Sequence, residues 1–260
     1  MTAPILQQRL PFAPWMEGRT WRLPGIVPLG DGNWVLRDEA FAGQMAERDR
    51  LIAGRLPLVH DLLPEGRDAV DELYRAVLGK IAGDAGYRVG LSEVARPDGV
   101  VVPLDPARPL VTLGRLVQED LCLMQARGDE HVLTGAILCF PASWTLAQKI
   151  GKPLTGIHVP VPHYDDGMAK RVQRLFDAIR VEQPLMRFNA LIYDDPVLHQ
   201  PRIEGAARPR PVEKIYLRSE RQCLMRLPET GAVVFSIHTY VVRIASLSVA
   251  EREGLAAAGL

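Results

Sequence analysis

The sequence lacks the features that mark several large classes of protein. Of its 260 residues only three are cysteines, Cys122, Cys139 and Cys223, and they form no CxxC pair. This set excludes a cysteine-bound iron–sulfur cluster and argues against a disulfide framework, so we expect three small buried hydrophobes. Lys and Arg together number 31, as do Asp and Glu, and the net charge of +0 gives no field that would attract nucleic acid or an anionic membrane.

The chain also has no targeting or nucleotide-binding signature. No apolar run is long enough to span a bilayer, and residues 1–15 lack the basic and apolar regions of a signal peptide, so we expect a cytoplasmic protein. There is no phosphate-binding glycine loop, GxGxxG fingerprint or nucleophile elbow. The composition, with 47% hydrophobic and 24% charged residues, is ordinary for a globular protein.

The most informative stretch of the sequence is a predicted hairpin. Residues 215–240 read as two long strands joined by a glycine-closed turn at 228–231. If the first strand alternates regularly, Arg221 lies in the middle of an otherwise apolar face, where a guanidinium needs an anionic or strongly polar partner. The charged residues on the opposite face are expected to form a solvated ladder; they are Arg218, Glu220 and Arg226.

The remaining patterns predict an α+β fold, with an antiparallel sheet and helices inserted after the second strand. The Pro-, Gly- and Trp-rich N-terminal segment 1–37 is expected to wrap over a core built elsewhere, and four prolines in 97–109 mark a linker or boundary. Helical patterns occur at 38–54, after Glu65, at 145–150, at 168–179 and from Ser248, which starts a predicted capping box. Strand patterns occur at 110–126, 131–140 and 186–193.

A proline-stiffened loop over residues 151–167 holds several side chains that could carry chemistry. They are His158, His163, Tyr164, Asp165 and Asp166. The apolar neighbours of His158 suit a haem-iron ligand, but a core histidine that donates to a backbone carbonyl gives the same pattern. His163 with the two aspartates could instead form a non-haem metal site, while Asp-Asp-Gly is also typical of a helix N-terminus.

Further polar residues lie on strand faces that should be at least half apolar. Arg187 and Asn189 share one face if their strand alternates, although an edge strand with a solvated face predicts the same pattern. His238 shares a face with Ser236 and Tyr240, where it either lines a polar patch or is exposed. Spacing alone therefore indicates an α+β domain with an inward Arg and a histidine-bearing loop.

Blocks in these same regions resemble a known family. FPASWTLAQKIGKPLTGIHVPVP at 140–162, LRSERQCLMRLPETGAVVFSIHTYV at 217–241 and WRLPGIVPLGDGNWVLRDEAFAGQMAERDRLI at 21–52 are similar to the haem-dependent oxidative N-demethylase alpha-subunit family. The resemblance spans most of the chain. It implies a PAS-like fold, haem b held by a protein histidine, and oxygen-dependent demethylation of a small methylated amine with release of formaldehyde.

On this resemblance each candidate residue takes an expected role. His158 matches the histidine of the IH-x-PVP block and is expected to be the axial iron ligand. Arg221 matches the second Arg of the ER-Q block and is expected either to stabilise negative charge at the iron or to pair with a haem propionate. The other expected residues are Tyr164 and Asn189 in catalysis and Arg187, His163 and His238 in cofactor binding.

The chain departs from the expected family pattern at Ala190, where a Trp is expected, and at His238, where an Arg is expected. We expect both departures to alter the haem pocket that the resemblance implies, and therefore to affect which amine is the substrate. We expect residues 1–104 to form a wrapping segment with helices, 105–247 the PAS-like haem-binding domain and 248–260 a helical tail.

The first hypothesis is therefore a haem-dependent oxidase subunit. Because the chain has no Rossmann fingerprint and no cluster-binding cysteines, its electrons would come from a separate flavin or iron–sulfur reductase. Two alternatives stay open. One is a PAS-like haem sensor without amine turnover, and the other is a non-haem metal or small-ligand protein that uses His163, Asp165 and Asp166.

Overall fold

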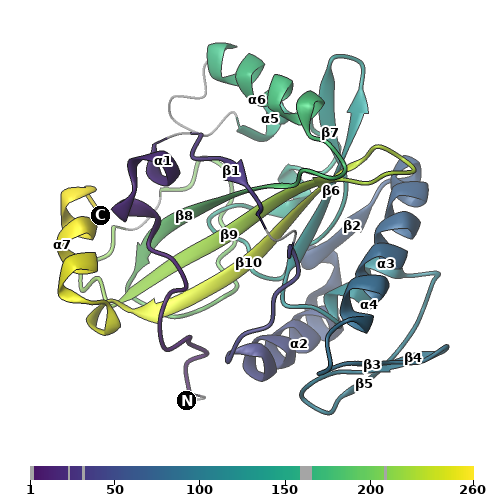
Figure 1. The fold of residues 1–260 in the computed structure, drawn as a ribbon, viewed down its shortest axis with the longest axis horizontal. Coiled ribbons are helices and arrows are strands. Elements are labelled where there is room, and N and C mark those ends of the chain that lie inside the picture. Colours follow the sequence, from purple (N-terminus) through teal and green to yellow (C-terminus); the bar gives the residue numbers. More distant parts are fainter. Residues whose placement is uncertain (1–2, 23, 31–32, 159–165, 208–209) are drawn as a thin grey trace.

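One antiparallel sheet of seven strands forms the centre of the molecule, so the predicted α+β class is confirmed (Figure 1). The computed structural model describes residues 3–22, 24–30, 33–158, 166–207 and 210–260. In spatial order the strands are β1 (Val27–Pro28), β8 (Leu185–Tyr193), β9 (Tyr216–Arg226), β10 (Val233–Arg243), β6 (Asp120–Arg127), β7 (Glu130–Ile137) and β2 (His60–Leu62). Each pairs antiparallel with its neighbours.

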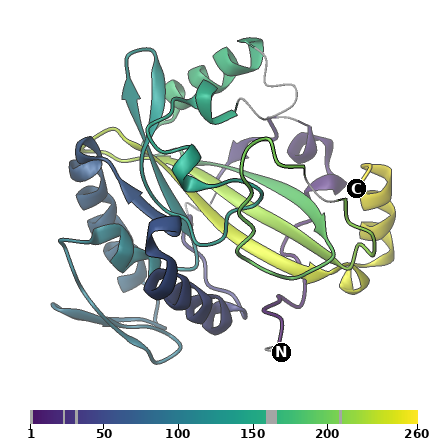
Figure 2. The same cartoon turned by 180° about the vertical axis from the view of Figure 1, so that it is seen from behind.

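The helices gather at three places around this sheet. At one end lie η2 (Pro64–Gly66), α2 (Phe41–Val59), α3 (Arg67–Ala82) and α4 (Pro109–Gly114), with a small sheet of β3 (Arg88–Val89), β4 (Glu93–Ala95) and β5 (Val101–Pro103). Near β7 lie η3 (Leu146–Gln148), α5 (Leu154–His158) and α6 (Asp166–Ala178). At the other end, η1 (Pro14–Met16) and α1 (Gly18–Trp21) lie beside η4 (Ile244–Ser246) and α7 (Val249–Ala257), as Figure 2 shows from behind. No helix in the described ranges is long and apolar enough to cross a membrane.

The strand register sorts the side chains of the sheet onto two covered faces. One packs against α5 and α6, and we call it the α5/α6 face; its apolar members include Cys122, Met124, Leu224, Val233 and Ile237. The other packs against the N-terminal segment and α7 along β8–β10, and we call it the N-terminal face; its apolar members there include Phe188, Ala190, Ile192, Leu217 and Tyr240. Since both faces are covered, each polar side chain of the central strands needs a partner inside the protein.

The N-terminal segment completes the edge of β10 where β6 stops. β6 pairs with β10 only over residues 233–237. Further along, Gln7 N–H donates to the Val241 carbonyl at 3.0 Å, and Val241 N–H donates to Gln7 Oε1 at 2.8 Å. The side-chain amides of Gln7 and Gln44 both donate to the Thr239 carbonyl. The predicted wrapping by the N-terminal segment is therefore confirmed for its described residues.

Most predicted elements are present, and Ser248 forms the predicted capping box of α7. The predicted strand over 110–126 is wrong in its first half, because Pro109 opens α4 and β6 begins only at Asp120. An apolar run is compatible with either element, and proline at the first helical position favours the helix. The predicted linker 97–109 likewise contains β5 and the start of α4.

The predicted loop 151–167 also contains regular structure, since α5 follows directly after Pro153. Proline is tolerated at the start of a helix, where its missing N–H has no partner to lose. The hairpin has its predicted turn, in which Leu227 N–H donates to the Ala232 carbonyl at 2.8 Å and Gly231 has φ of 71°. The boundary at residue 104 stays a prediction, and one apolar core joins α2 and α3 to the strands of the sheet.

Glu72 of α3 fixes the turn of the hairpin. Its buried carboxylate accepts the backbone N–H groups of Glu229 and Thr230 at 2.7 and 2.8 Å, and the Thr230 hydroxyl at 2.6 Å. Arg75 and Glu229 join the same two elements on the surface, where both side chains are exposed.

We expect Glu72→Ala to lower the free energy of unfolding by about 2–4 kcal/mol, because three donors of the turn lose their charged acceptor. Urea unfolding measures the change. Arg75→Gln is the matched control, and the loss of this surface pair should cost less than about 1 kcal/mol. Equal losses in the two variants would show that Glu72 does not fix the turn.

Candidate functional site

Polar side chains meet on the α5/α6 face of β8 and β9. In the strand register Arg187 is opposite Gln222 and Asn189 is opposite Glu220. Asn189 Nδ2 donates to Glu220 Oε2 at 2.8 Å, and Glu220 N–H donates to Asn189 Oδ1 at 2.9 Å. Gln222 Nε2 donates to the same Glu220 oxygen at 3.0 Å. We call these four residues and Arg218 the β8–β9 polar cluster.

Arg218 supplies the counter-charge for Glu220. Its Nη2 and Nε lie 3.0 and 3.2 Å from Glu220 Oε1, and its Nη1 donates to the Leu198 carbonyl at 2.7 Å. Nη2 also donates to the Phe140 carbonyl in a close contact. Arg218 is 1% exposed and Glu220 is 5% exposed, so the predicted solvated ladder is wrong. The segments that carry Phe140 and Leu198 cover this face, and the buried charges compensate each other.

Arg187 is the member of the cluster without a full set of partners. Its side chain is half-buried, and its Nε has no hydrogen-bond partner among the described residues. Burial lowers the pKa of Arg187, while the negative charge of Glu220 acts in the opposite direction. A half-buried guanidinium with an unpaired nitrogen favours binding of an additional anionic group.

His158, the last residue of α5, lies within electrostatic reach of Arg187. Its Nδ1 is 2.8 Å from the Leu154 carbonyl, which can only accept, so Nδ1 carries the proton and Nε2 the lone pair. Burial lowers the pKa of His158, and the positive charges of Lys149 and Arg187 lower it further. The hydrogen bond to the Leu154 carbonyl acts to raise the pKa, but it does not outweigh these effects. The result is a neutral imidazole with a fixed tautomer.

The α5/α6 face is not covered equally along the sheet. The side chains of β8 on this face are all half-buried, whereas on its other side Phe188, Ala190 and Ile192 are buried and Met186 is half-buried. The half-buried set is Leu185, Arg187, Asn189, Leu191 and Tyr193. α5 and α6 pack against β7, several strands away from β8 (Figure 1). The partly open region between β8 and the end of α5 is therefore the candidate site.

Arg221 and His238 lie on the opposite, N-terminal face, as a cross-strand pair. Arg221 is 8% exposed, and its Nη2 donates to the Asn33 carbonyl at 2.8 Å. The predicted inward Arg with a polar partner is confirmed. The two ring nitrogens of His238 lie 2.9 Å from Glu119 Oε1 and 3.1 Å from Asp38 Oδ2. In the described part of the chain, Arg221 Nη1 and Glu119 Oε2 are buried without a partner.

The predicted site residues thus do not all meet at one place. Those on the α5/α6 face are His158, Arg187 and Asn189, and those on the N-terminal face are Arg221 and His238. That Arg221 and His238 contact a cofactor stays a prediction. A cofactor bound on the α5/α6 face would have to extend past the sheet to contact them. His163, Tyr164 and Asp165 lie outside the described residues. Within the described ranges, no group of three or more His, Cys, Asp or Glu is placed to hold a metal ion.

A family model described as haem-dependent oxidative N-demethylase, alpha subunit-like, matches residues 25–258, which is nearly the whole chain. The chain belongs to this family. The match includes every strand of the main sheet, and it confirms the resemblance inferred from the sequence blocks.

In this member of the N-demethylase alpha subunit-like family, both departures from the expected pattern lie on the N-terminal face. Ala190 is buried in the apolar cluster that contains Trp15, and His238 is held by Asp38 and Glu119. Neither side chain points toward the α5/α6 face. The residues of the candidate site are therefore separate from both departures.

Sequence reasoning missed Arg218 and Glu220 as site members. One signal was present in the sequence: charged residues lie on both faces of one long strand. Such a strand either carries buried ion pairs or has one solvated face. The structure decides in favour of burial, because the segments that carry Phe140 and Leu198 cover Arg218 and Glu220.

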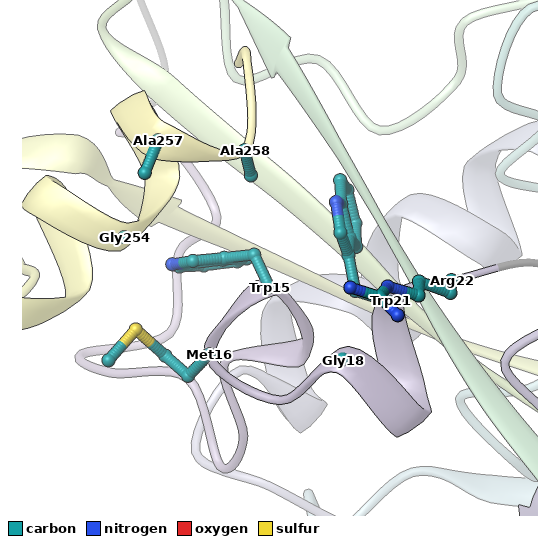
Figure 3. A pocket seen from close by; sticks show the side chains of 8 residues that line it. All are labelled: Trp15, Met16, Gly18, Trp21, Arg22, Gly254, Ala257 and Ala258. Atoms are coloured by element: carbon teal, nitrogen blue, oxygen red, sulfur yellow. The ribbon is translucent and has the colours of Figure 1, made fainter.

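Figure 3 shows a surface hollow of about 350 Å³ away from this site, between α1, η1 and α7. The indole Nε1 of Trp15 donates to the Glu251 carbonyl at 2.9 Å and fixes the ring beneath α7. The larger residues that line the hollow are Trp15, Met16, Trp21 and Arg22. None of the predicted site residues lines it, so it is not part of the candidate site.

The His238 cluster joins the N-terminal segment to the sheet through charges. Burial acts to lower the pKa of His238, but the hydrogen bonds and charges of Asp38 and Glu119 outweigh it and raise the pKa to about 9. Burial acts to raise the pKa of Asp38, but hydrogen bonds from His238, Gln118 and Gln7 and the charge of His238 lower it to about 2. His238 is therefore a buried cation at neutral pH.

These shifts predict how stability depends on pH. The raised pKa of His238 means that its contribution is complete below about pH 6.5 and is lost as the pH rises through about 9. The lowered pKa of Asp38 means that its contribution is complete above about pH 4 and is lost as the pH falls toward about 2. We expect His238→Gln to remove an alkaline loss of unfolding free energy on the order of 3 kcal/mol, measured by urea unfolding between about pH 6 and 9.5.

His60→Gln is the control for this measurement. Burial lowers the pKa of His60, so its contribution to stability has the opposite sign and the alkaline loss should persist in the variant. An alkaline loss that is unchanged in His238→Gln would contradict the assignment of the buried cation.

Proposed function

We propose that the protein is the haem-binding subunit of an oxygen-dependent N-demethylase and that haem b binds on the α5/α6 face. The proposed substrate is a small methylated amine, which leaves as the shorter amine and formaldehyde. One observation carries this proposal: a neutral His158 imidazole of fixed tautomer lies within electrostatic reach of an incompletely paired Arg187, at the partly open end of the face. The family description supports the same chemistry.

We further propose that the sheet and its inserted helices form a PAS-like domain. Strands β7, β6, β10, β9 and β8 are neighbours in that order, so the second, first, fifth, fourth and third strands of this set lie side by side. α5 and α6 are inserted between its second and third strands and pack on one face. This topology supports the arrangement implied by the family resemblance, with the ligand between helices and sheet.

The residues of the candidate site fit a haem. Nε2 of His158 carries the lone pair that an iron ligand requires, and donation from Nδ1 to the Leu154 carbonyl orients the ring and raises its basicity. Arg187 offers a guanidinium to a propionate. Ile157, which precedes His158, and Leu185, on the same strand face as Arg187, offer partly buried apolar surface.

When bound, the haem supplies the oxygen chemistry, and the protein holds and orients the reactants. We propose that His158 holds the iron and that Arg187 fixes the orientation of the macrocycle. Asn189 positions Glu220 through its two hydrogen bonds, and Arg218 pairs with Glu220 at 3.0 Å.

Electrons must come from outside the chain in this proposal. The alpha-subunit description of the family implies a partner subunit, and we propose a flavin or iron–sulfur reductase in that role. The cytoplasm is the proposed location, because the buried thiols of Cys122 and Cys139 form no disulfide and fit a reducing compartment. For Arg221 and His238 we propose that they position the N-terminal segment against the sheet.

Expression with haem supply tests the proposal. We expect a Soret band that stays with the protein through purification, and formaldehyde release from a dimethylated amine when a chemical reductant and oxygen are added. Haem binding without formaldehyde from any of a panel of methylated amines would favour a sensor, and the absence of a Soret band would contradict the proposal.

We expect His158→Ala to remove most of the bound haem without changing the circular dichroism spectrum, because the iron loses its protein ligand. His163→Ala is the matched variant from the same predicted loop and should retain haem. If His158→Ala kept full haem with an unchanged ferric spectrum while His163→Ala lost it, the assignment of the ligand would be wrong.

Two Arg→Leu variants on opposite faces of the sheet locate the cofactor. We expect Arg187→Leu to weaken haem binding about tenfold or more, because a charge-assisted propionate contact is lost. Arg221→Leu should keep the haem affinity and change the unfolding free energy instead. Haem titration and urea unfolding measure the two effects, and the reverse outcome would place the haem on the N-terminal face.

A further inference from the structure

A second surface hollow, of about 610 Å³, lies where the start of β9, the end of β10 and α7 meet. Its volume is in the range of small-molecule sites. The cationic side chains that line it are Lys214, Arg243 and Arg252, and the apolar ones are Ile215, Ile244 and Ala245. No carboxylate lines it, although the sequence as a whole has equal numbers of acidic and basic residues.

The three cations have no oppositely charged partner among the described residues. Within the described ranges none of them forms a salt bridge, whereas many other arginines do. Arg243 lies with its guanidinium carbon 5.2 Å from the centre of the Tyr216 ring, and Arg252 Nη1 donates to the Leu247 carbonyl. These contacts hold the two side chains in place without neutralising their charge.

The backbone places the third cation at the same hollow. Lys214 has φ of 50°, a conformation that costs free energy for a residue other than glycine. It is held there because both carboxylate oxygens of Asp194 accept backbone N–H groups, from Val212 at 2.8 Å and from Glu213 and Lys214 at 2.9 Å. The next residue, Ile215, belongs to the apolar lining of the hollow, and its carbonyl accepts the Ile244 N–H at 2.9 Å.

We propose that this hollow binds a small molecule that carries a compact dianion, either a phosphate monoester or a dicarboxylate, next to an apolar group. Two guanidinium groups can pair bidentately with such an anion, and the ammonium group adds a third charge. The apolar group packs on Ile215 and Ile244. The site is separate from the proposed haem site, and its ligand binding does not depend on haem.

Calorimetric titration of the full chain at low ionic strength and about pH 8 tests this proposal. The probes are phenyl phosphate, phthalate and benzoate, which share a ring but differ in charge and acid group. We expect saturable 1:1 binding of phenyl phosphate or phthalate, and much weaker binding of the monoanion benzoate. Binding of phenyl phosphate alone identifies the ligand as a phosphate ester, and binding of phthalate alone identifies it as a dicarboxylate.

The double variant Arg243→Gln with Arg252→Gln should weaken binding about tenfold or more. Lys214→Gly is the sharper variant, because glycine relieves the positive φ, so the protein should be at least as stable while its affinity falls severalfold. Arg88→Gln, an exposed arginine of β3, is the control and should bind as the native chain does. No saturable binding of either dianion up to about 10 mM, or binding that these variants leave unchanged, would overturn the proposal.

Discussion

The structure depends on how charge is buried on both sides of one long hairpin. β9 and β10 lie in the middle of the sheet, and neighbouring residues of β9 point to opposite faces: Glu220 to one and Arg221 to the other. A buried charge is tolerated only where it is paired and hydrogen-bonded. The partners come from remote segments, because Arg218 reaches carbonyls at Phe140 and Leu198 while Arg221 reaches Asn33. The hairpin therefore requires covering layers on both faces, and the N-terminal segment is one of them.

The need of buried charges for partners also bears on where a ligand could bind. Both faces hold a guanidinium nitrogen without a partner among the described residues, in Arg187 and in Arg221. Their surroundings differ, because Arg221 is closed in by the N-terminal segment, whereas the side chains around Arg187 on β8 are half-buried. A planar cofactor needs an accessible face as well as a counter-charge, and the described residues of the α5/α6 face combine a half-buried guanidinium with a histidine of fixed tautomer, which is why we propose the cofactor there.

The sequence was sufficient for much of the fold and for part of the site. The hairpin, the helix 168–179 and the capping box at Ser248 carry local signals, and their structures agree with them. The segment 110–126 was misassigned because an apolar run does not distinguish a short buried helix from a strand. The burial of Arg218 and Glu220 could not be predicted from alternation, since it depends on the remote segments that cover them.

Successive side chains of β9 point to opposite faces of the sheet, and this alternation explains why the family blocks identify the family but do not by themselves assign functional residues. In the segment 217–223 the residues of the candidate site alternate with residues that bind the N-terminal segment. A substitution in this block can therefore alter either the α5/α6 face or the packing of the N-terminal face. Adjacent positions lie on opposite faces, so their substitutions have different effects. His238 illustrates this point, because it lies within the family block 217–241 but on the face that holds the N-terminal segment. Under the proposed function, retention of the chemistry is therefore tested at His158, Arg187, Asn189 and Glu220, which belong to the α5/α6 face.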